Sequence, residues 1–383
     1  MVPRTPPPGG QVGKDDKGMV SSRLLLVACG LLAFCARQSL PAEGRYDVIG
    51  QQEFHYPTGY AAPQALTVFR WDRAGTFWAG GVGSPHIFNF DGSGQYRGAL
   101  DLRAVPGWED RRPSPWDVAF DEQGYAYVLL SMISPGESVL SPVIGKYSRD
   151  YKFAGSIVLQ DILDPRTFVA ATGQYFYVVG LESFGTDTGK LVHKFDRLGR
   201  KVSAFVHFDV GAALSNDSVE NLADWVSGAI VLQEPDTLLI AQPAWPTITL
   251  RRFDLDGNEI SPARLVQIPL LGPNDLGPDP FDSKVLTDQR NLQCSVSGRN
   301  LIVWQSYTQK KQRPDGVVYT PSLAARAYVV GLDTGVVNMT DLPTLDSLGG
   351  KLGVLQFVDD KGDLFFRCDY PGRIVLLKCR RRS

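Results

Sequence analysis

The residues of this sequence that could do chemistry are charged and aromatic side chains standing at or near the start of short apolar runs. Carboxylate, guanidinium and indole groups that converge on one concavity can hold a small anionic or sugar-like ligand. The same groups can instead pair with one another or cap loops, and this structural role is the competing interpretation. The candidates for ligand binding are Trp116, Asp117, Arg166, Asp224, Trp225, Arg290 and Asn291.

Motifs of metal binding and hydrolysis are missing from the sequence. The histidines form no HxH or HExxH pair and stand at His55, His86, His193 and His207. Since His86 and His193 are each two residues from a Phe in a strand-like run, we expect them to pack within the fold. Residues 254–259, Asp-Leu-Asp-Gly-Asn-Glu, look like part of a calcium loop but lack the later glutamate of an EF-hand. The sequence therefore predicts a turn there, no metal site and no catalytic residue.

Two further tryptophans are candidates for binding a partner. Trp108 precedes the charged residues 109–112, and Trp245 stands between two prolines. An exposed indole can anchor a protein interface. The alternative is that both side chains hold long loops in place.

A repeated motif must position these residues, and its clearest copy is Lys-Phe-Asp-Arg-Leu-Gly-Arg at 194–200. The aromatic residue ends a strand, the Asp side chain accepts a backbone N–H two residues on, and Gly accepts a positive φ. Further copies of this corner stand at 90–94, 147–150, 253–257 and 332–335. Each copy predicts a tight hairpin.

A second motif, a short apolar and β-rich run after a turn, precedes each corner and recurs once more near the end of the chain. Its copies lie at 76–80, 125–129, 175–179, 237–240, 300–304 and 363–367. Each unit then contains four antiparallel strands. Four-stranded units that repeat about every 40–50 residues are typical of β-propellers. The predicted fold class is therefore all-β, a six-bladed β-propeller whose first strands line a central channel, with the ligand candidates at one mouth.

The two ends of the propeller are expected to meet. The last unit supplies only three strands, whereas 45–50 reads as a strand with no unit of its own. We predict that this N-terminal strand completes the last blade, because closing the ring removes an exposed sheet edge. Insertions between the repeated units are expected to form loops at 131–142, 181–190, 271–284 and 305–325. The loop at 305–325 is expected to be polar and basic.

The first residues suggest export. Residues 1–18 are rich in Pro and Gly, which predicts disorder or a mis-assigned start ahead of Met19. Arg23 and the apolar run 24–36 have the layout of a signal peptide over 19–42, too short to span a membrane comfortably, and leave 43–383 as the propeller. Residues 26–30 are similar to a bacterial lipobox, so Cys29 is a candidate lipid anchor, with chance similarity as the alternative. The expected location is periplasmic, cell-surface or secreted.

Net charge and cysteine content limit the classes of partner and of covalent cross-link to expect. A net charge of −2 shows no basic excess, so no nucleic-acid partner is expected. Removal of the signal would leave three cysteines, and this odd number argues against a disulfide framework. A two-residue turn after Tyr370 would place Cys368 opposite Val375 and Cys379 opposite Leu364, so the sequence favours buried thiols.

On the repeated turn–strand elements and the Phe-Asp-x-x-Gly corners, residues 45–378 resemble the six-bladed propellers of the NHL-repeat group and related bacterial exported propellers. The resemblance implies a rigid ring whose loops bind a partner near the channel. Metal-dependent lactonases of the gluconolactonase type share the six-bladed scaffold and hold a cation with Glu, Asn and Asp residues. Here Asp117 and Asn291 could supply two ligands, but no Glu stands at a matching position.

Two functions follow from this reading. The favoured one is a monomeric, non-enzymatic exported scaffold without a cofactor, which presents loops and the channel mouth to a protein, peptide or glycan. The alternative is a lactonase-like hydrolase or a lyase with a divalent cation at the channel mouth.

Overall fold

A computed structural model describes most of the chain beyond the expected signal segment. The described residues are 46–72, 75–108, 114–131, 142–162, 165, 167–170, 174–180, 188–209, 229–234, 236–244, 247–279, 281, 283–320, 323–340 and 353–381. Segments 1–18 and 19–42, with Cys29, lie outside them. In this part of the chain the helical elements are two 3-10 turns, Leu102–Ala104 and Pro273–Asp275, and no helix is long and apolar enough to cross a bilayer.

The described strands form antiparallel sheets of four consecutive strands. The first three sheets contain β2 (Ala65–Trp71), β3 (Phe77–Val82), β4 (His86–Phe90) and β5 (Tyr96–Asp101); β6 (Ser114–Phe120), β7 (Ala126–Ser131), β8 (Val143–Tyr147) and β9 (Phe153–Val158); and β10 (Thr167–Ala170), β11 (Tyr175–Val179), β12 (Thr188–Asp196) and β13 (Lys201–Asp209). Each runs in chain order, as hairpin turns between neighbouring strands require.

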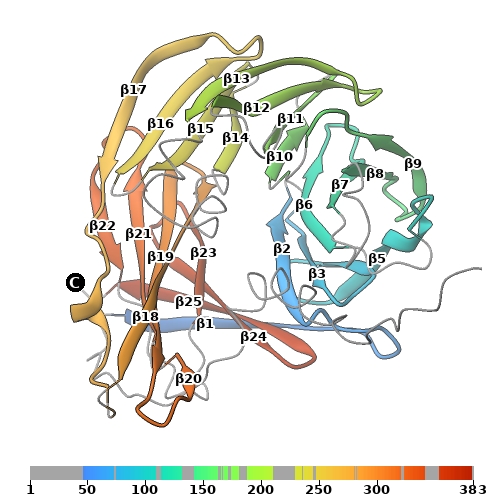
Figure 1. Cartoon of the computed structure of the whole chain (residues 1–383). Coiled ribbons are helices and arrows are strands. Elements are labelled where there is room, and N and C mark those ends of the chain that lie inside the picture. Colours follow the sequence, from blue (N-terminus) through green and yellow to red (C-terminus); the bar gives the residue numbers. More distant parts are fainter. Residues whose placement is uncertain are drawn as a thin grey trace, which may run out of the picture.

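Two more sheets follow in the same order. They contain β14 (Ala229–Glu234), β15 (Thr237–Ala244), β16 (Thr247–Asp254) and β17 (Glu259–Gln267); and β18 (Lys284–Ser297), β19 (Asn300–Gln312), β21 (Leu323–Gly331) and β22 (Val337–Thr340), with the short β20 (Val318–Tyr319) beside β19. In Figure 1 the sheets follow one another around a common centre. Packed four-stranded antiparallel sheets in this arrangement form a β-propeller fold.

The last sheet joins the two ends of the described chain. Its order is β23 (Val354–Val358), β24 (Leu364–Tyr370), β25 (Arg373–Arg381) and β1 (Tyr46–His55). β1 pairs with β25 from His55 opposite Arg373 to Tyr46 opposite Arg381, with a register shift between Val48 and Gly50. The strand expected from 45–50 is thus present, is longer than expected, and lies in the last sheet.

The three clearest corners, at Asp91, Asp196 and Asp254, are Asp-started turns, as the sequence predicts. At Asp91, Oδ1 accepts the N–H groups of Ser93 and Gln95 at 2.8 and 2.9 Å, and the Gly94 N–H donates to the Asp91 carbonyl at 2.9 Å. Asp196 and Asp254 make the same bonds to the residues two and four positions on. The side chain therefore satisfies turn N–H groups that the strand ladders cannot reach.

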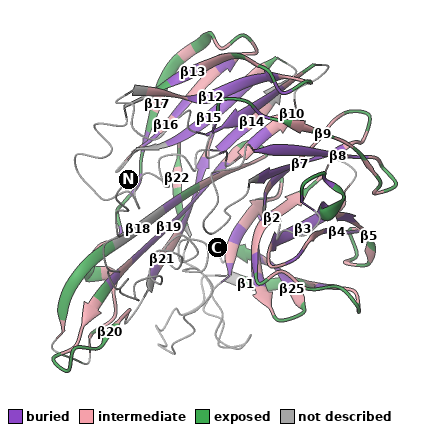
Figure 2. Ribbon diagram, turned by 45° about the vertical axis from the view of Figure 1, so that its right-hand side comes forward, coloured by how far each residue is buried: buried purple, intermediate pink, exposed green. Residues whose placement is uncertain are grey.

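Apolar clusters between neighbouring sheets form the core. One cluster places Phe54 of β1 edge-on to Phe77 of β3 and Phe90 of β4, with ring centroids 4.8 and 5.6 Å apart, and adds Leu376 of β25. It joins the last sheet to the first, and comparable clusters join the sheets in between. Figure 2 shows burial concentrated on strands such as β15 and β19, whereas β20 is intermediate or exposed. Each large side chain buried this way contributes about 1.5–3 kcal/mol.

The expected basic loop over 305–325 is wrong. β19 continues through Gln312, and β21 begins at Leu323, so most of this segment extends a hairpin of the fifth sheet. Tyr307 is fully buried there against Leu271, because the preceding loop folds over this face. The polar and basic composition of this segment suggested that it is exposed to solvent, whereas the neighbouring loop packs against it and buries Tyr307. The described residues of 271–284 do form a loop, while those of 131–142 and 181–190 show only strand ends and Pro142.

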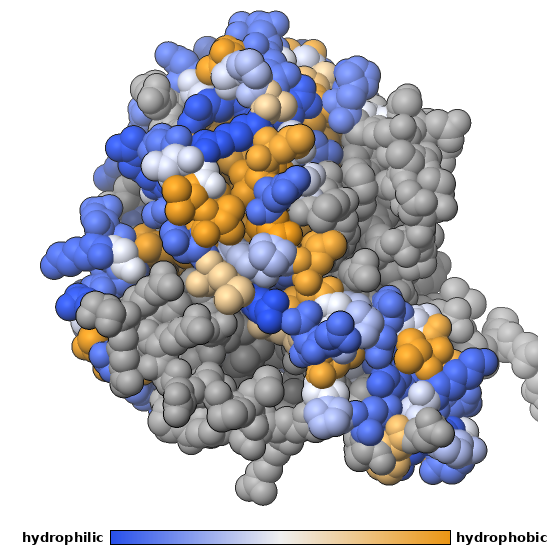
Figure 3. Space-filling view, turned by 90° about the vertical axis from the view of Figure 1, so that its left-hand side faces the viewer, coloured by the Kyte–Doolittle hydropathy of each residue, from blue (hydrophilic) through white to orange (hydrophobic). Residues whose placement is uncertain are grey.

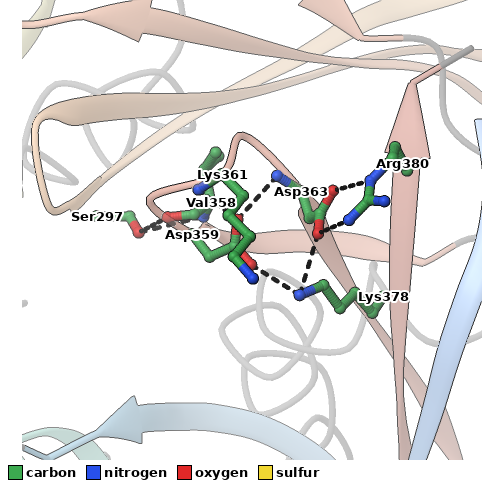
Figure 4. A network of polar contacts seen from close by, with 7 residues as sticks. All are labelled: Ser297, Val358, Asp359, Lys361, Asp363, Lys378 and Arg380. Atoms are coloured by element: carbon green, nitrogen blue, oxygen red, sulfur yellow. Dashed lines mark hydrogen bonds and ion pairs between the residues drawn. The ribbon is translucent and has the colours of Figure 1, made fainter.

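A polar network ties the last sheet to the one before it (Figure 4). The carboxylate of Asp363, almost fully buried, accepts from Nε and Nη2 of Arg380 at 2.7 and 2.8 Å, and Lys378 Nζ lies 3.0 Å away. Lys378 also donates to Asp359 at 2.8 Å. Ser297, the last residue of β18, exchanges hydrogen bonds with the backbone of Val358. The hydrogen bonds from Arg380 hold the pKa of Asp363 well below its usual range.

Replacing Gly94 by Ala should destabilise the protein. Gly94 has φ of +88°, and an added Cβ would overlap the carbonyl oxygen of Glu53 in β1. We expect a loss of about 2 kcal/mol, combining the left-handed conformation with this clash. Gly92→Ala is the matched control in the same turn, since its Cβ would meet only Gly75 O at 3.4 Å. Urea unfolding of both variants checks this, and equal stabilities would contradict it.

The Asp363 network should make stability depend on pH. A carboxyl whose pKa is lower in the folded than in the unfolded state stabilises the fold above its unfolded pKa of about 3.9, and this contribution is lost as the pH falls further. Asp363→Asn should therefore lower the urea midpoint at pH 7, and the gap to the unmodified protein should narrow below pH ~4. Asp150→Asn, at an exposed turn residue, is the control. A gap that stays constant down to pH ~2 would show that the charge of Asp363 contributes nothing.

Candidate functional site

The first strands of the first three sheets lie side by side and meet at Asp117. β6 contacts β2 on one side and β10 on the other. Trp116 occupies a register shift between Pro115 and Asp117 in the pairing of β6 with β7, which is a β-bulge. Bulges re-aim side chains. Here the carboxylate of Asp117 reaches both neighbouring strands, and the residue is only 2% exposed.

Five donors of the protein surround the Asp117 carboxylate. Oδ1 accepts from Arg70 Nε and from the Val118 N–H, both at 2.8 Å. Oδ2 accepts from Arg70 Nη2 and Thr167 Oγ1 at 2.9 Å and from the Phe168 N–H at 3.0 Å. A carboxylate offers about four lone-pair sites. The hydrogen-bonding capacity of the Asp117 carboxylate is therefore filled by groups of the protein. These contacts match the structural role, pairing within the fold, that was the alternative to ligand binding.

Arg70 is the second charged group of this arrangement. Its guanidinium pairs with both oxygens of Asp117, yet the side chain is 41% exposed. The Asp117 charge raises the pKa of Arg70 further above its ordinary value. Next to this pair, Thr67 Oγ1 donates to the carbonyl oxygen of Pro115, so β2 and β6 are joined twice. Arg70 and Thr167 were not among the candidates expected from the sequence. A signal was present, because Arg70 and Asp117 are lone, opposite charges in the apolar first strands of consecutive repeats.

The structure places the other ligand candidates only in part. Trp116 is half-buried and packs on the cluster between the second and third sheets. Arg166 lies outside the described residues, so its role stays a prediction. The backbone of Arg290 and Asn291 lies in β18, opposite β19. Asp224, Trp225 and the partner candidate Trp245 fall outside the described residues, so their roles stay predictions.

The expectation that Trp108 is exposed is wrong. Its side chain is 3% exposed and belongs to the apolar cluster between the first and second sheets. The 3-10 turn at Leu102–Ala104 and the hydrogen bond from Trp108 N to Val105 O fold this segment back over the cluster. Trp108 thus holds its loop in place, which is the alternative role considered from the sequence.

The two strand histidines have packing contacts. His193 on β12 is fully buried, with Nε2 3.1 Å from the Gly180 carbonyl oxygen and its ring 6.4 Å from Phe195. His86, at the start of β4, has its ring 5.9 Å from Phe88. Within the ranges that the structure describes, no group of three or more His, Cys, Asp or Glu side chains could hold a metal ion.

The three cysteines of the described residues, Cys294, Cys368 and Cys379, form no disulfide. Cys368 pairs with Val375 and Cys379 with Leu364, the register predicted from a two-residue turn. Both side chains are fully buried, and burial raises the pKa of Cys379 to about 11. These cysteines therefore serve as small apolar residues in the last sheet.

Comparison with known proteins gives a fold and no family. Neither a protein-family model nor a curated protein matches this chain. A solved structure from Bacteroides fragilis NCTC 9343, described as an exported protein, shares 9% identity and a TM-score of 0.51, over 88% of this chain and 96% of that one. A DUF4221 member from Bacteroides vulgatus ATCC 8482 gives 11% identity and a TM-score of 0.48, over 88% and 97%. Virginiamycin B lyase from Staphylococcus aureus gives 9% and 0.43, over 86% and 99%. At such identities the likeness concerns the fold alone.

Replacing Asp117 by Ala should strongly destabilise the protein. The change leaves the Arg70 charge without its partner and two backbone N–H groups without an acceptor. Each buried N–H group left without an acceptor costs about 1–3 kcal/mol, whereas the Arg70 side chain, 41% exposed, can bond to water instead. Asp333→Ala removes an exposed ion pair with Arg299 and should cost about 1 kcal/mol at most. Denaturant unfolding measures both variants, and equal losses would mean that the Asp117 contacts add little.

Proposed function

We propose that this chain is an exported β-propeller scaffold that binds a protein, peptide or glycan at its channel mouth. The proposed ring has six blades, is similar to the NHL-repeat propellers, spans 43–383 and acts as a monomer without a cofactor. β1 completes the last blade. This closure is supported by the pairing of β1 with β25 and by the apolar cluster around Phe54 that joins the last sheet to the first.

The observation that carries the proposal is the saturation of Asp117. A lactonase-like or lyase site at the channel mouth would need this carboxylate as a cation ligand. In the structure its oxygens hold the guanidinium of Arg70, the Thr167 hydroxyl and two backbone N–H groups. Binding a cation would break these bonds and place the ion next to the Arg70 charge, which is electrostatically unfavourable. A rigid framework for binding agrees better with these contacts.

An exposed apolar surface supports a protein partner. Apolar side chains gather on the face shown in Figure 3, the side of the molecule that carries β17 and β22. Exposed large apolar residues on or beside these strands are Ile260, Leu265, Val336 and Met339, with 52%, 65%, 55% and 39% of their surface exposed. Exposed apolar side chains gathered on one face are typical of interaction sites.

Export is proposed from the signal-like layout of 19–42. The Bacteroides fragilis protein of the same fold is described as exported, which agrees with this location. A lipid anchor at Cys29 is proposed as the membrane attachment, and Trp245 as a partner contact.

Metal analysis and array binding test the proposal together. Purified protein should carry no stoichiometric divalent ion, and should bind members of a glycan or peptide array. Trp116→Ala, Arg290→Ala and Asn291→Ala should reduce that binding roughly tenfold, because each removes a side chain that we propose to contact the ligand. Arg97→Ala, an exposed residue paired with Asp91, is the control. One bound divalent ion per chain that is lost in Asp117→Asn would establish the metal-dependent alternative instead.

A further inference from the structure

A pocket outside the channel opens beside the first sheet. Its volume is about 430 Å³, within the range of small-molecule sites. Three segments form it: the loop between β1 and β2 at Gly59–Ala61, the turn before β4 at Pro85 and His86, and the end of β5 with the following 3-10 turn. The structure brings together four side chains that no sequence motif connects, Tyr60, His86, Asp101 and Arg103.

One wall of the pocket is a planar ion pair. Asp101 Oδ1 accepts from Arg103 Nε at 2.9 Å, and Oδ2 accepts from Nη2 at 2.8 Å. The Arg103 N–H also donates to Asp101 Oδ1 at 3.1 Å, so the 3-10 turn holds both groups in place. The side chains are 44% and 48% exposed. The pair therefore offers fixed donors and acceptors to a ligand while adding no net charge.

His86 forms the second polar group of the pocket. It stands opposite Asp101 in the pairing of β4 with β5, so both side chains lie on one face of the sheet. Burial lowers the pKa of His86, and the imidazole is neutral at pH 7. Its Nδ1 is enclosed and has no hydrogen-bond partner among the described residues. Since a buried N–H without an acceptor is costly, the proton belongs on Nε2, which leaves one donor for a ligand.

Tyr60 supplies an aromatic surface. Its ring is edge-on to the rings of His86 and Phe88, with centroids 4.8 and 5.7 Å apart, which fixes its orientation. The residue is nevertheless 42% exposed. The face of an aromatic ring carries negative potential, and it attracts the weakly positive C–H groups of a saturated ring. An exposed, immobilised tyrosine beside fixed polar groups suits a ligand with one apolar face.

We propose that this pocket binds a neutral, polyhydroxylated ligand, a monosaccharide unit of a glycan. The C–H face of the sugar lies against Tyr60, adjacent hydroxyls bond to Asp101 and Arg103, and a further hydroxyl accepts from His86. This proposal rests on the binding function proposed above. It adds a second site, separate from the channel mouth, and names the class of ligand bound there.

The charges of the pocket favour this ligand over an anion. Arg103 is neutralised by Asp101 through two hydrogen bonds, and His86 is neutral, so no uncompensated positive charge attracts a carboxylate or phosphate. A vicinal diol can donate to Asp101 and accept from Arg103 at once. Selection among ligands then follows from paired hydrogen bonds, since a ligand without these hydroxyls would leave the polar groups unpaired.

Direct binding of simple sugars tests the proposal. Neutral methyl glycosides of glucose, galactose and mannose, with glucuronate and inorganic phosphate as charged probes, are titrated into the purified protein by calorimetry and ligand-observed NMR. At least one neutral glycoside should bind saturably. Tyr60→Ala and Arg103→Ala should weaken this binding roughly tenfold or more. Tyr60→Phe should retain most of it, because the ring face remains.

Arg97→Ala is the matched control, since Arg97 lies on the same β5 strand and forms an exposed ion pair away from the pocket. Unfolding midpoints of all variants show whether a loss of binding reflects a loss of fold. Binding of only glucuronate or phosphate would overturn the proposal, as would no binding of any neutral glycoside. If no sugar binds in the titrations but array binding depends on the channel-mouth residues, only the proposal of a sugar pocket is contradicted. If sugar binding depends on Tyr60 and the channel-mouth variants keep all of their array binding, the proposed binding at the channel mouth is contradicted instead.

Discussion

Each sheet of this protein is apolar on both faces and must therefore be covered on both sides. Strands such as β15, β19 and β24 bury side chains toward two neighbouring sheets, and the apolar clusters form between the sheets. A four-stranded sheet alone would leave these side chains in water, where each costs about 1.5–3 kcal/mol relative to burial. The need for a neighbour on each side explains why similar units follow one another around a centre. It also explains why the last sheet, with β1 at its edge, packs against the first.

Apolar packing alone defines only weakly how far one sheet is shifted along its neighbour. Polar contacts between sheets define this position. The pair of Asp117 and Arg70 joins β2, β6 and β10, and two hydrogen bonds between Ser297 and the backbone of Val358 join the fifth sheet to the last. Hydrogen bonds are directional, so a shift of one sheet by one residue would leave these polar groups unpaired. The charged residues that first suggested a ligand site thus contribute to the framework.

The pocket that we propose as a sugar site is lined by residues whose hydrogen bonds and rings are fixed but whose surfaces stay accessible. Tyr60, Asp101 and Arg103 satisfy both conditions, since their partners lie in the first sheet and its adjoining turns. His86 packs on Phe88 and also lines the pocket, so its packing role does not exclude a role toward a ligand. Rigid elements reduce the entropy lost on binding, which is how a propeller can support recognition with few contacts.

The sequence by itself determined what depends on neighbouring residues. The Asp-x-x-Gly corners, the order of strands and the register that separates Cys368 from Cys379 follow from turn geometry over a few positions, and the structure contains them. Counting strands also led to β1 in the last sheet, because only one unit lacked a fourth strand. Only the tertiary structure decided what depends on contacts between distant segments. Trp108 is buried by a turn that folds back, Tyr307 by a separate loop, and Asp117 is saturated by residues from two other sheets. Tyr60 and Arg103 form one pocket for the same reason: their spacing along the chain carries no information until the sheet brings them together.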